Sequence, residues 1–185
     1  MQILITYSSG YGTTREVAER IGQVLTVEPL FHVELVSIDE VTSIRPYEAV
    51  ILGSSVRASH PLANVVDFLA LHRHELENKQ VALFLVCLEA NSAEGRCKVR
   101  HEHLPQLLDR FPTIHPIAAE AFGGKIDFAR LNPVMQSLMR RVLEQTALPT
   151  EGSVDTRDWA FIEQWAADLR QKLLSLQPSS PVENP

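Results

Sequence analysis

The chain has 185 residues, a hydrophobic fraction of 45% and a formal net charge of −6. Its length fits one domain, which we expect to span 1–176, with 177–185 as a disordered tail. The acidic balance argues against nucleic acid as the main partner, and no apolar run reaches the roughly 18 residues that a membrane span needs. Two cysteines, Cys87 and Cys97, do not make a disulfide framework. We expect a cytoplasmic protein, because the chain opens on an apolar strand and not on a signal peptide.

Apolar strand patterns and helical patterns alternate along the chain. The strand patterns predict five strands, over residues 2–7, 32–38, 49–53, 81–87 and 114–122. Apolar positions at helical spacing predict helices over 13–26, 62–74, 98–110 and 159–176. Pro105 indicates a break or a late start in the third helix, and Asp155 and Asp158 are typical of a cap before the last one. This alternation predicts an α/β fold in which helices cover both faces of a parallel sheet.

The turn between the first strand and the first helix is rich in hydroxyl groups and glycine. Such a turn gathers backbone N–H groups at a helix N-terminus, where the helix dipole favours an anion. The turn lacks the lysine of a Walker loop and the third glycine of a dinucleotide fingerprint. Neutral donors of this kind favour a phosphate monoester as ligand, and the alternative is a turn that only caps the helix. The candidate residues are Ser8, Ser9, Gly10, Tyr11, Gly12, Thr13 and Thr14.

The same turn resembles the FMN-phosphate loop of the flavodoxin family. Three further segments, 50–60, 121–126 and 155–159, resemble one branch, the menaquinone-dependent protoporphyrinogen IX dehydrogenases of haem synthesis. The resemblance implies a flavodoxin-like three-layer sandwich with a five-stranded parallel sheet in the order 2-1-3-4-5. In such a sheet the ligand lies beyond the carboxyl ends of the strands, at the switch point.

The resemblance therefore implies that three loops bind FMN. The second and third loops, 54–60 and 88–97, contain no aromatic residue that could stack on the flavin ring. Solvated polar loops are the alternative for both. Beyond the first loop, the implied cofactor-binding residues are Ser54, Ser55, Val56, Arg57, Leu88, Glu89, Ala90 and Asn91.

An insertion over 124–148 separates the fifth strand from the last helix. Its apolar residues repeat at i, i+3, i+4 and i+7, which predicts one amphipathic helix. Arginines occupy the opposite face, so segment 130–145 is locally basic. Four alternatives stay open: an ordinary core helix, a lid over the substrate site, a homodimer face, and peripheral contact with the inner face of the cell membrane that gives access to a quinone. The apolar positions are Leu131, Val134, Met135, Leu138, Met139, Val142 and Leu143.

The sequence leads to an FMN-dependent oxidoreductase as the main hypothesis. By resemblance it oxidises protoporphyrinogen IX with a quinone acceptor, and no protein acid or base is required because the flavin carries the chemistry. An electron-carrier flavodoxin and a binding module without cofactor are the alternatives. We expect no metal site, because His101 and His103 lack further ligands at suitable spacing. The residues expected to meet the substrate carboxylates are Arg57, His60, Lys125 and Arg130.

Overall fold

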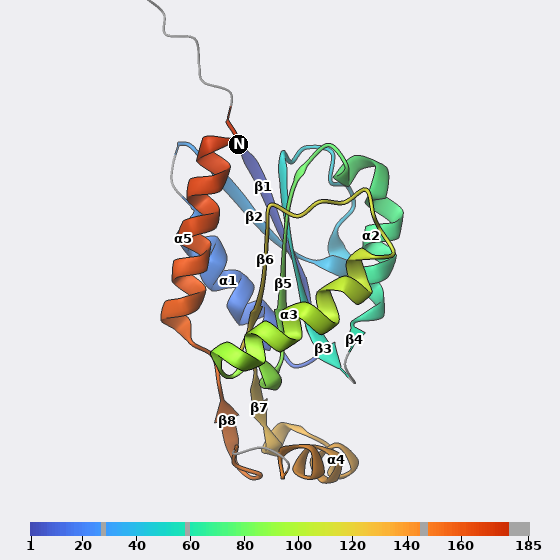
Figure 1. The fold of residues 1–185 in the computed structure, drawn as a ribbon, viewed down its shortest axis with the longest axis vertical. Coiled ribbons are helices and arrows are strands. Elements are labelled where there is room, and N and C mark those ends of the chain that lie inside the picture. Colours follow the sequence, from blue (N-terminus) through green and yellow to red (C-terminus); the bar gives the residue numbers. More distant parts are fainter. Residues whose placement is uncertain (27–28, 58–59, 145–147, 178–185) are drawn as a thin grey trace, which may run out of the picture.

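A central parallel sheet organises the computed structural model, which describes residues 1–26, 29–57, 60–144 and 148–177. The strand order is β2-β1-β3-β5-β6 (Figure 1). Because β5 and β6 are the fourth and fifth parallel strands along the chain, this order confirms the predicted 2-1-3-4-5. Strands β3 and β5 lie in the interior of the sheet, and their apolar runs are covered on both faces. The bounds are β1 (Gln2–Ser8), β2 (His32–Ser37), β3 (Ala49–Arg57), β5 (Gln80–Val86) and β6 (Ala118–Phe122).

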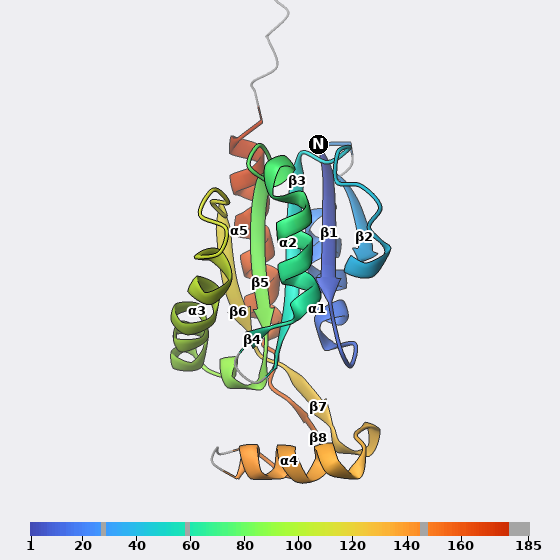
Figure 2. The same cartoon turned by 90° about the vertical axis from the view of Figure 1, so that its right-hand side faces the viewer.

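Two pairs of helices cover the two faces of this sheet, as Figures 1 and 2 show. Helices α1 (Thr13–Leu25) and α5 (Trp159–Ser175) pack on one face, in a core that includes Ile21, Phe84 and Leu169. Helices α2 (Ala63–Leu76) and α3 (Ala93–Leu108) pack on the other. The two cores sit on opposite sides of the same strands because successive side chains of a strand alternate in direction.

Several predicted boundaries shift for local reasons. The third helix begins at Ala93 and not at residue 98, because the Ser92 hydroxyl accepts a hydrogen bond from the Gly95 amide and caps it. Pro105 lies inside this helix and does not end it. The fifth strand begins at Ala118 and not at residue 114, since the Ile114 amide closes a turn onto the Phe111 carbonyl.

Three short helices and one short strand connect the main elements. Strand β3 runs past the predicted end at residue 53 and pairs antiparallel with β4 (His60–Pro61). The one-turn helices are η1 (Ile38–Glu40), η2 (Leu88–Ala90) and η3 (Phe128–Arg130). Residues 58–59 of the second predicted ligand loop, 145–147 of the insertion and 178–185 of the predicted tail lie outside the described residues.

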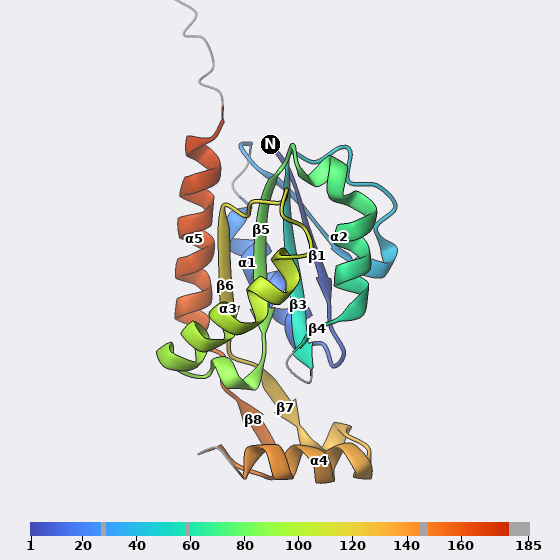
Figure 3. The same ribbon diagram turned by 45° about the vertical axis from the view of Figure 1, so that its right-hand side comes forward.

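The predicted insertion forms a small unit of its own beyond the carboxyl ends of the sheet strands. A two-stranded antiparallel ribbon, β7 (Lys125–Asp127) and β8 (Ser153–Asp155), carries helix α4 (Pro133–Leu143). Figures 2 and 3 show α4 lying across this end of the molecule. Leu143 of α4 and Leu131, which precedes the helix, pack with Ile126, Phe128 and Val154 in a separate apolar cluster.

Candidate functional site

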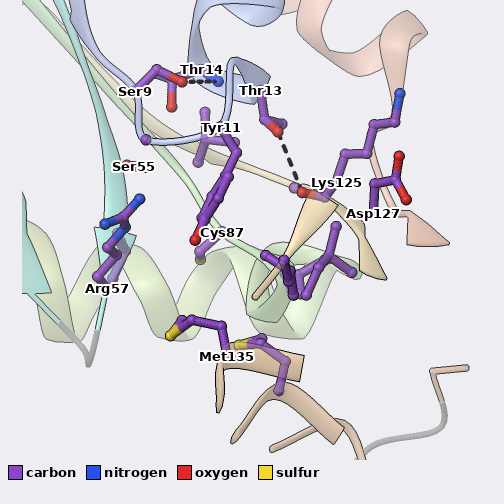
Figure 4. Close-up of a pocket in the computed structure, with 18 of the residues that line it drawn as sticks. Ser9, Tyr11, Thr13, Thr14, Ser55, Arg57, Cys87, Lys125, Asp127 and Met135 are labelled. Atoms are coloured by element: carbon purple, nitrogen blue, oxygen red, sulfur yellow. Dashed lines mark hydrogen bonds between the residues drawn. The ribbon is translucent and has the colours of Figure 1, made fainter. Parts of the chain in front are cut away.

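A cavity of about 640 Å³ lies between the carboxyl ends of β1, β3 and β5 and the inner side of α4. This end of a parallel sheet is where ligands of doubly wound folds bind. Residues from the β1–α1 loop, from the end of β3, from the segment after β5 and from the insertion all line it. Figure 4 shows side chains from these segments pointing into one common space.

The β1–α1 loop forms one wall. Gly12 has φ of 88° immediately before the first residue of α1, a conformation that favours glycine. The Thr14 amide donates a hydrogen bond of 3.2 Å to the Ser9 hydroxyl, which holds the loop closed over the helix start (Figure 4). Within the described residues, the amides of Gly10, Tyr11, Gly12 and Thr13 have no protein acceptor. The loop therefore presents free N–H donors at the positive end of the α1 dipole, which suits an anion.

Arg57, the last residue of β3, extends across this loop. Its guanidinium lies 5.2 Å from the centre of the Tyr11 ring, and a Cβ atom on Gly10 would lie 1.5 Å from its Nη2. The absence of a side chain at Gly10 thus allows the cation to approach the loop backbone. Lys125 also belongs to the residues that line the cavity, and in Figure 4 its side chain extends away from the Tyr11 ring.

The segment after β5 forms the floor. Cys87 lies below Tyr11 (Figure 4), and burial raises the pKa of its thiol to about 11, so the thiol is neutral at physiological pH. Next to it, a hydrogen bond from Lys98 lowers the pKa of Glu89 and keeps that carboxylate ionised. A Cβ atom on Gly124 would lie 3.1 Å from backbone atoms of Cys87 and Leu88, so the strand that leaves toward the insertion passes close to this floor.

The insertion forms the wall opposite the sheet. The side chains of α4 that line the cavity are apolar, and they are Met135, Leu138, Met139 and Val142. The stem of the insertion is held to the first wall, because the Thr13 hydroxyl donates a hydrogen bond to the Lys125 carbonyl. Helix α4 is therefore one wall of the cavity. Val134, on its outward side, is 77% exposed.

The comparisons with known proteins agree with this geometry. A model of the flavodoxin domain matches residues 4–153. The chain belongs to the flavodoxin family. It is also 25% identical over 189 aligned residues to the protoporphyrinogen IX dehydrogenase (quinone) of Leishmania major, and the match covers 98% of this chain and 81% of that protein.

Solved flavodoxin structures share the fold. A flavodoxin from the domain Archaea superposes with a TM-score of 0.56 at 16% identity and covers 94% of this chain and 99% of its own. Oxidised flavodoxin 1 from Bacillus cereus gives a TM-score of 0.56 at 15% identity, with 96% of this chain and 100% of that chain covered. At these identities the likeness shows the fold alone.

Most residues that the sequence proposes for the flavodoxin site line the cavity. These are Ser9, Gly10, Tyr11, Thr13, Thr14, Ser55, Val56, Arg57, Leu88, Glu89, Lys125 and Arg130. The other proposed site residues do not line the cavity. The Ser8 hydroxyl donates to Asn64, the Ser54 hydroxyl accepts from the Leu62 amide, and His60 pairs with Gln106 of α3. Gly12 shapes the loop backbone, Ala90 is buried in the core and Asn91 is exposed at the end of η2.

The sequence-based prediction omits several residues of the cavity, among them Cys87 and His103. Cys87 ends an apolar strand, a position typical of a small core residue, and in the structure it packs on the core and also lines the cavity. The sequence places His103 only among the weak metal-site candidates. Among the described residues, no group of three or more histidine, cysteine or acidic side chains is placed to hold a metal ion, and no helix is long and apolar enough to cross a bilayer.

Proposed function

We propose that this flavodoxin-family protein binds FMN and oxidises protoporphyrinogen IX, with a quinone as the electron acceptor. One observation supports an enzyme over an electron carrier: the insertion covers one side of a cavity with an apolar wall beside the phosphate loop. A carrier that delivers electrons to a protein partner has no need of such a wall. The relative from Leishmania major, which matches 98% of this chain, bears the name of this activity.

The polar groups of the cavity fit the cofactor. Two hydroxyl oxygens, Thr14 Oγ1 and Ser55 Oγ, are buried and have no hydrogen-bond partner among the described residues. Buried polar atoms without partners are rare in native proteins, and both of these belong to residues that line the cavity, which supports a polar ligand there. Together with the free amides of the β1–α1 loop, Thr14 would bind the phosphate group. Ser55, at the end of β3, would meet the part of the cofactor that extends across the sheet.

FMN, when bound, supplies two-electron oxidation of an organic substrate. The chain's own residues then have three tasks. Helix α4 excludes water with its methionine and leucine side chains, and an apolar enclosure strengthens the electrostatic interactions inside it. Arg57, Lys125 and Arg130 would bind the carboxylates of the substrate, as charge-assisted hydrogen bonds. Cys87 stays a neutral thiol and adds no competing negative charge.

The outer side of α4 would give access to the quinone by lying on an anionic membrane surface. Val134 is 77% exposed there, with Arg141 beside it, and Leu138 lies between this side and the cavity. Apolar residues flanked by arginine are typical of helices that lie in the plane of a bilayer. In a flotation assay with anionic vesicles, Val134→Ser should reduce binding, whereas Leu71→Ser, which removes an equally exposed leucine from α2, should not. Equal binding of both variants and wild type, or a stable homodimer through α4 in solution, would contradict this membrane contact.

Anaerobic turnover tests the proposed activity. FMN-loaded protein should convert protoporphyrinogen IX to the fluorescent porphyrin in the presence of a quinone, at a rate well above the protein-free reaction.

Met135→Glu, which places a carboxylate in the cavity wall, should raise the KM for protoporphyrinogen IX at least about tenfold, since the new carboxylate repels the carboxylates of the substrate. Ser137→Glu is the matched control, because Ser137 belongs to the same helix but is exposed and does not line the cavity. FMN binding without turnover would favour the electron carrier, and a folded protein that binds no FMN would favour a binding module.

A further inference from the structure

His103 is a buried histidine without a hydrogen-bond partner. It lies on α3, is 2% exposed and belongs to the residues that line the cavity. Both ring nitrogens are buried, and neither has a hydrogen-bond partner among the described residues. A buried polar group that is not hydrogen-bonded is unfavourable, and such groups in native structures call for an explanation.

The nearest acidic group does not provide that explanation. Glu89 Oε2 lies 3.8 Å from His103 Nε2, which is too long for a hydrogen bond. The Glu89 carboxylate already accepts a hydrogen bond from Lys98, on the same helix as His103. An ion pair with His103 would form only if the imidazole were protonated, and that would still leave Nδ1 without a partner.

Other histidines of the chain have ordinary explanations. His72 is also buried, but its Nδ1 lies 3.3 Å from Glu75 and its ring packs on Phe68 at 4.7 Å between centroids. His101, one half-turn from His103 on α3, is exposed and bonds the carbonyl of Cys97 at 2.8 Å. His103 therefore differs from both: it is buried, it borders the cavity, and its hydrogen-bonding capacity is unused.

We propose that His103 donates a hydrogen bond to the flavin ring of the bound cofactor, whose carbonyl oxygens and ring nitrogens are acceptors. The assignment rests on the proposed function, because it takes FMN as the occupant of the cavity. The ring is the matching part of FMN, since the phosphate donors lie in the β1–α1 loop while His103 borders the cavity with Cys87 and Glu89, after β5. His103 is thereby a binding residue for the ring, placed by the packing of α3.

The test compares FMN with riboflavin, which has the same ring and no phosphate. Flavin fluorescence quenching gives the dissociation constants for wild type, His103→Leu and the matched control His101→Leu. We expect His103→Leu to weaken both FMN and riboflavin about tenfold, to shift the absorption bands of bound FMN, and to leave the melting temperature of the cofactor-free protein unchanged or higher. His101→Leu should stay within about twofold of wild type for both ligands.

Two further outcomes decide the assignment. His103→Gln, which keeps a donor, should recover part of the lost affinity; it also serves if the leucine variant does not fold. Wild-type affinity for riboflavin in both His103 variants would overturn the assignment while leaving the proposed function intact. A folded wild type that binds neither flavin would overturn both, so the two failures are distinguishable.

Discussion

Arg157 donates a hydrogen bond to Glu16, a contact between residues 141 positions apart in the chain. Its side chain is only 4% exposed, bonds Asp155 of β8 at 2.6 Å and lies over the Trp159 ring at 4.4 Å. Glu16 belongs to the first turn of α1, directly after the candidate phosphate loop. This arginine therefore ties the ribbon that carries α4 to the helix that carries the loop.

Replacement of this arginine should loosen the ribbon. Arg157→Gln leaves two carboxylates without their shared cation, and we expect a loss of about 1–3 kcal/mol in the free energy of unfolding. Hydrogen exchange at the amides of β7 and β8 should accelerate. Arg15→Gln, which breaks an exposed pair with Glu19, should cost less than about 0.5 kcal/mol. Equal effects of the two variants in urea unfolding would show that Arg157 is not an anchor.

The same anchor predicts a dependence of stability on pH. The hydrogen bond from Arg157 holds the pKa of Asp155 below its ordinary value of 3.8. The stabilising contribution is therefore fully present above the unfolded pKa and is lost as the pH falls through it toward the folded pKa. The difference in melting temperature between wild type and Asp155→Asn should be constant above about pH 6 and shrink below about pH 4. A difference that does not change with pH would contradict this role.

Two glycines should respond to alanine with opposite signs. A Cβ atom on Gly123 would lie 2.0 Å from the Thr156 carbonyl oxygen, where backbone faces backbone between β6 and the segment before α5. Gly123→Ala should therefore destabilise the protein by about 1–3 kcal/mol. On Gly22, inside α1, a Cβ would meet Ile5 at an ordinary 3.4 Å. Gly22→Ala should stabilise by up to about 1 kcal/mol through helix propensity, and urea unfolding measures both.

The two cysteines should differ in reactivity. Burial raises the pKa of Cys87 to about 11, so about one thiol in a thousand is ionised at pH 8, whereas Cys97 is exposed. Iodoacetamide should label Cys97 first, and in the Cys97→Ser variant labelling should be slower by at least about tenfold. Saturating FMN should slow the reaction of Cys87 further, because Cys87 lines the cavity. Mass spectrometry follows each site, and rapid labelling of Cys87 would contradict its burial.

The fold follows from the sequence because each element carries its own pattern. Apolar runs such as Val81–Val86 are continuous since both faces of the central strands are covered. The β1–α1 loop is local too: its glycine, hydroxyl groups and helix start are neighbours in the chain. Of the two carboxylates expected to cap the last helix, Asp158 does so through the Phe161 amide, while Asp155 pairs with Arg157.

The remaining features depend on contacts that no local pattern contains. The apolar stripe on α4 predicts an amphipathic helix, but it does not predict which part of the molecule covers that stripe. The β7–β8 ribbon positions α4, and each of its strands has only three residues. His103 resembles a surface histidine in sequence, because Glu102 precedes it. Its burial results from the packing of α3 against β6 and η2, which is a tertiary contact.

The most direct test of the account is the binding of FMN by wild type and Thr14→Val. The Thr14 hydroxyl is fully buried without a partner, so valine, of equal shape, should leave the stability of the cofactor-free protein unchanged or higher. Fluorescence quenching should show FMN binding by wild type and affinity weaker by about tenfold, or about 1.4 kcal/mol, in Thr14→Val. Thr26→Val, which removes a hydroxyl at the other end of α1, should bind like wild type. A folded wild type that does not quench FMN, or equal affinity in Thr14→Val, would contradict the central claim that this loop holds the cofactor's phosphate.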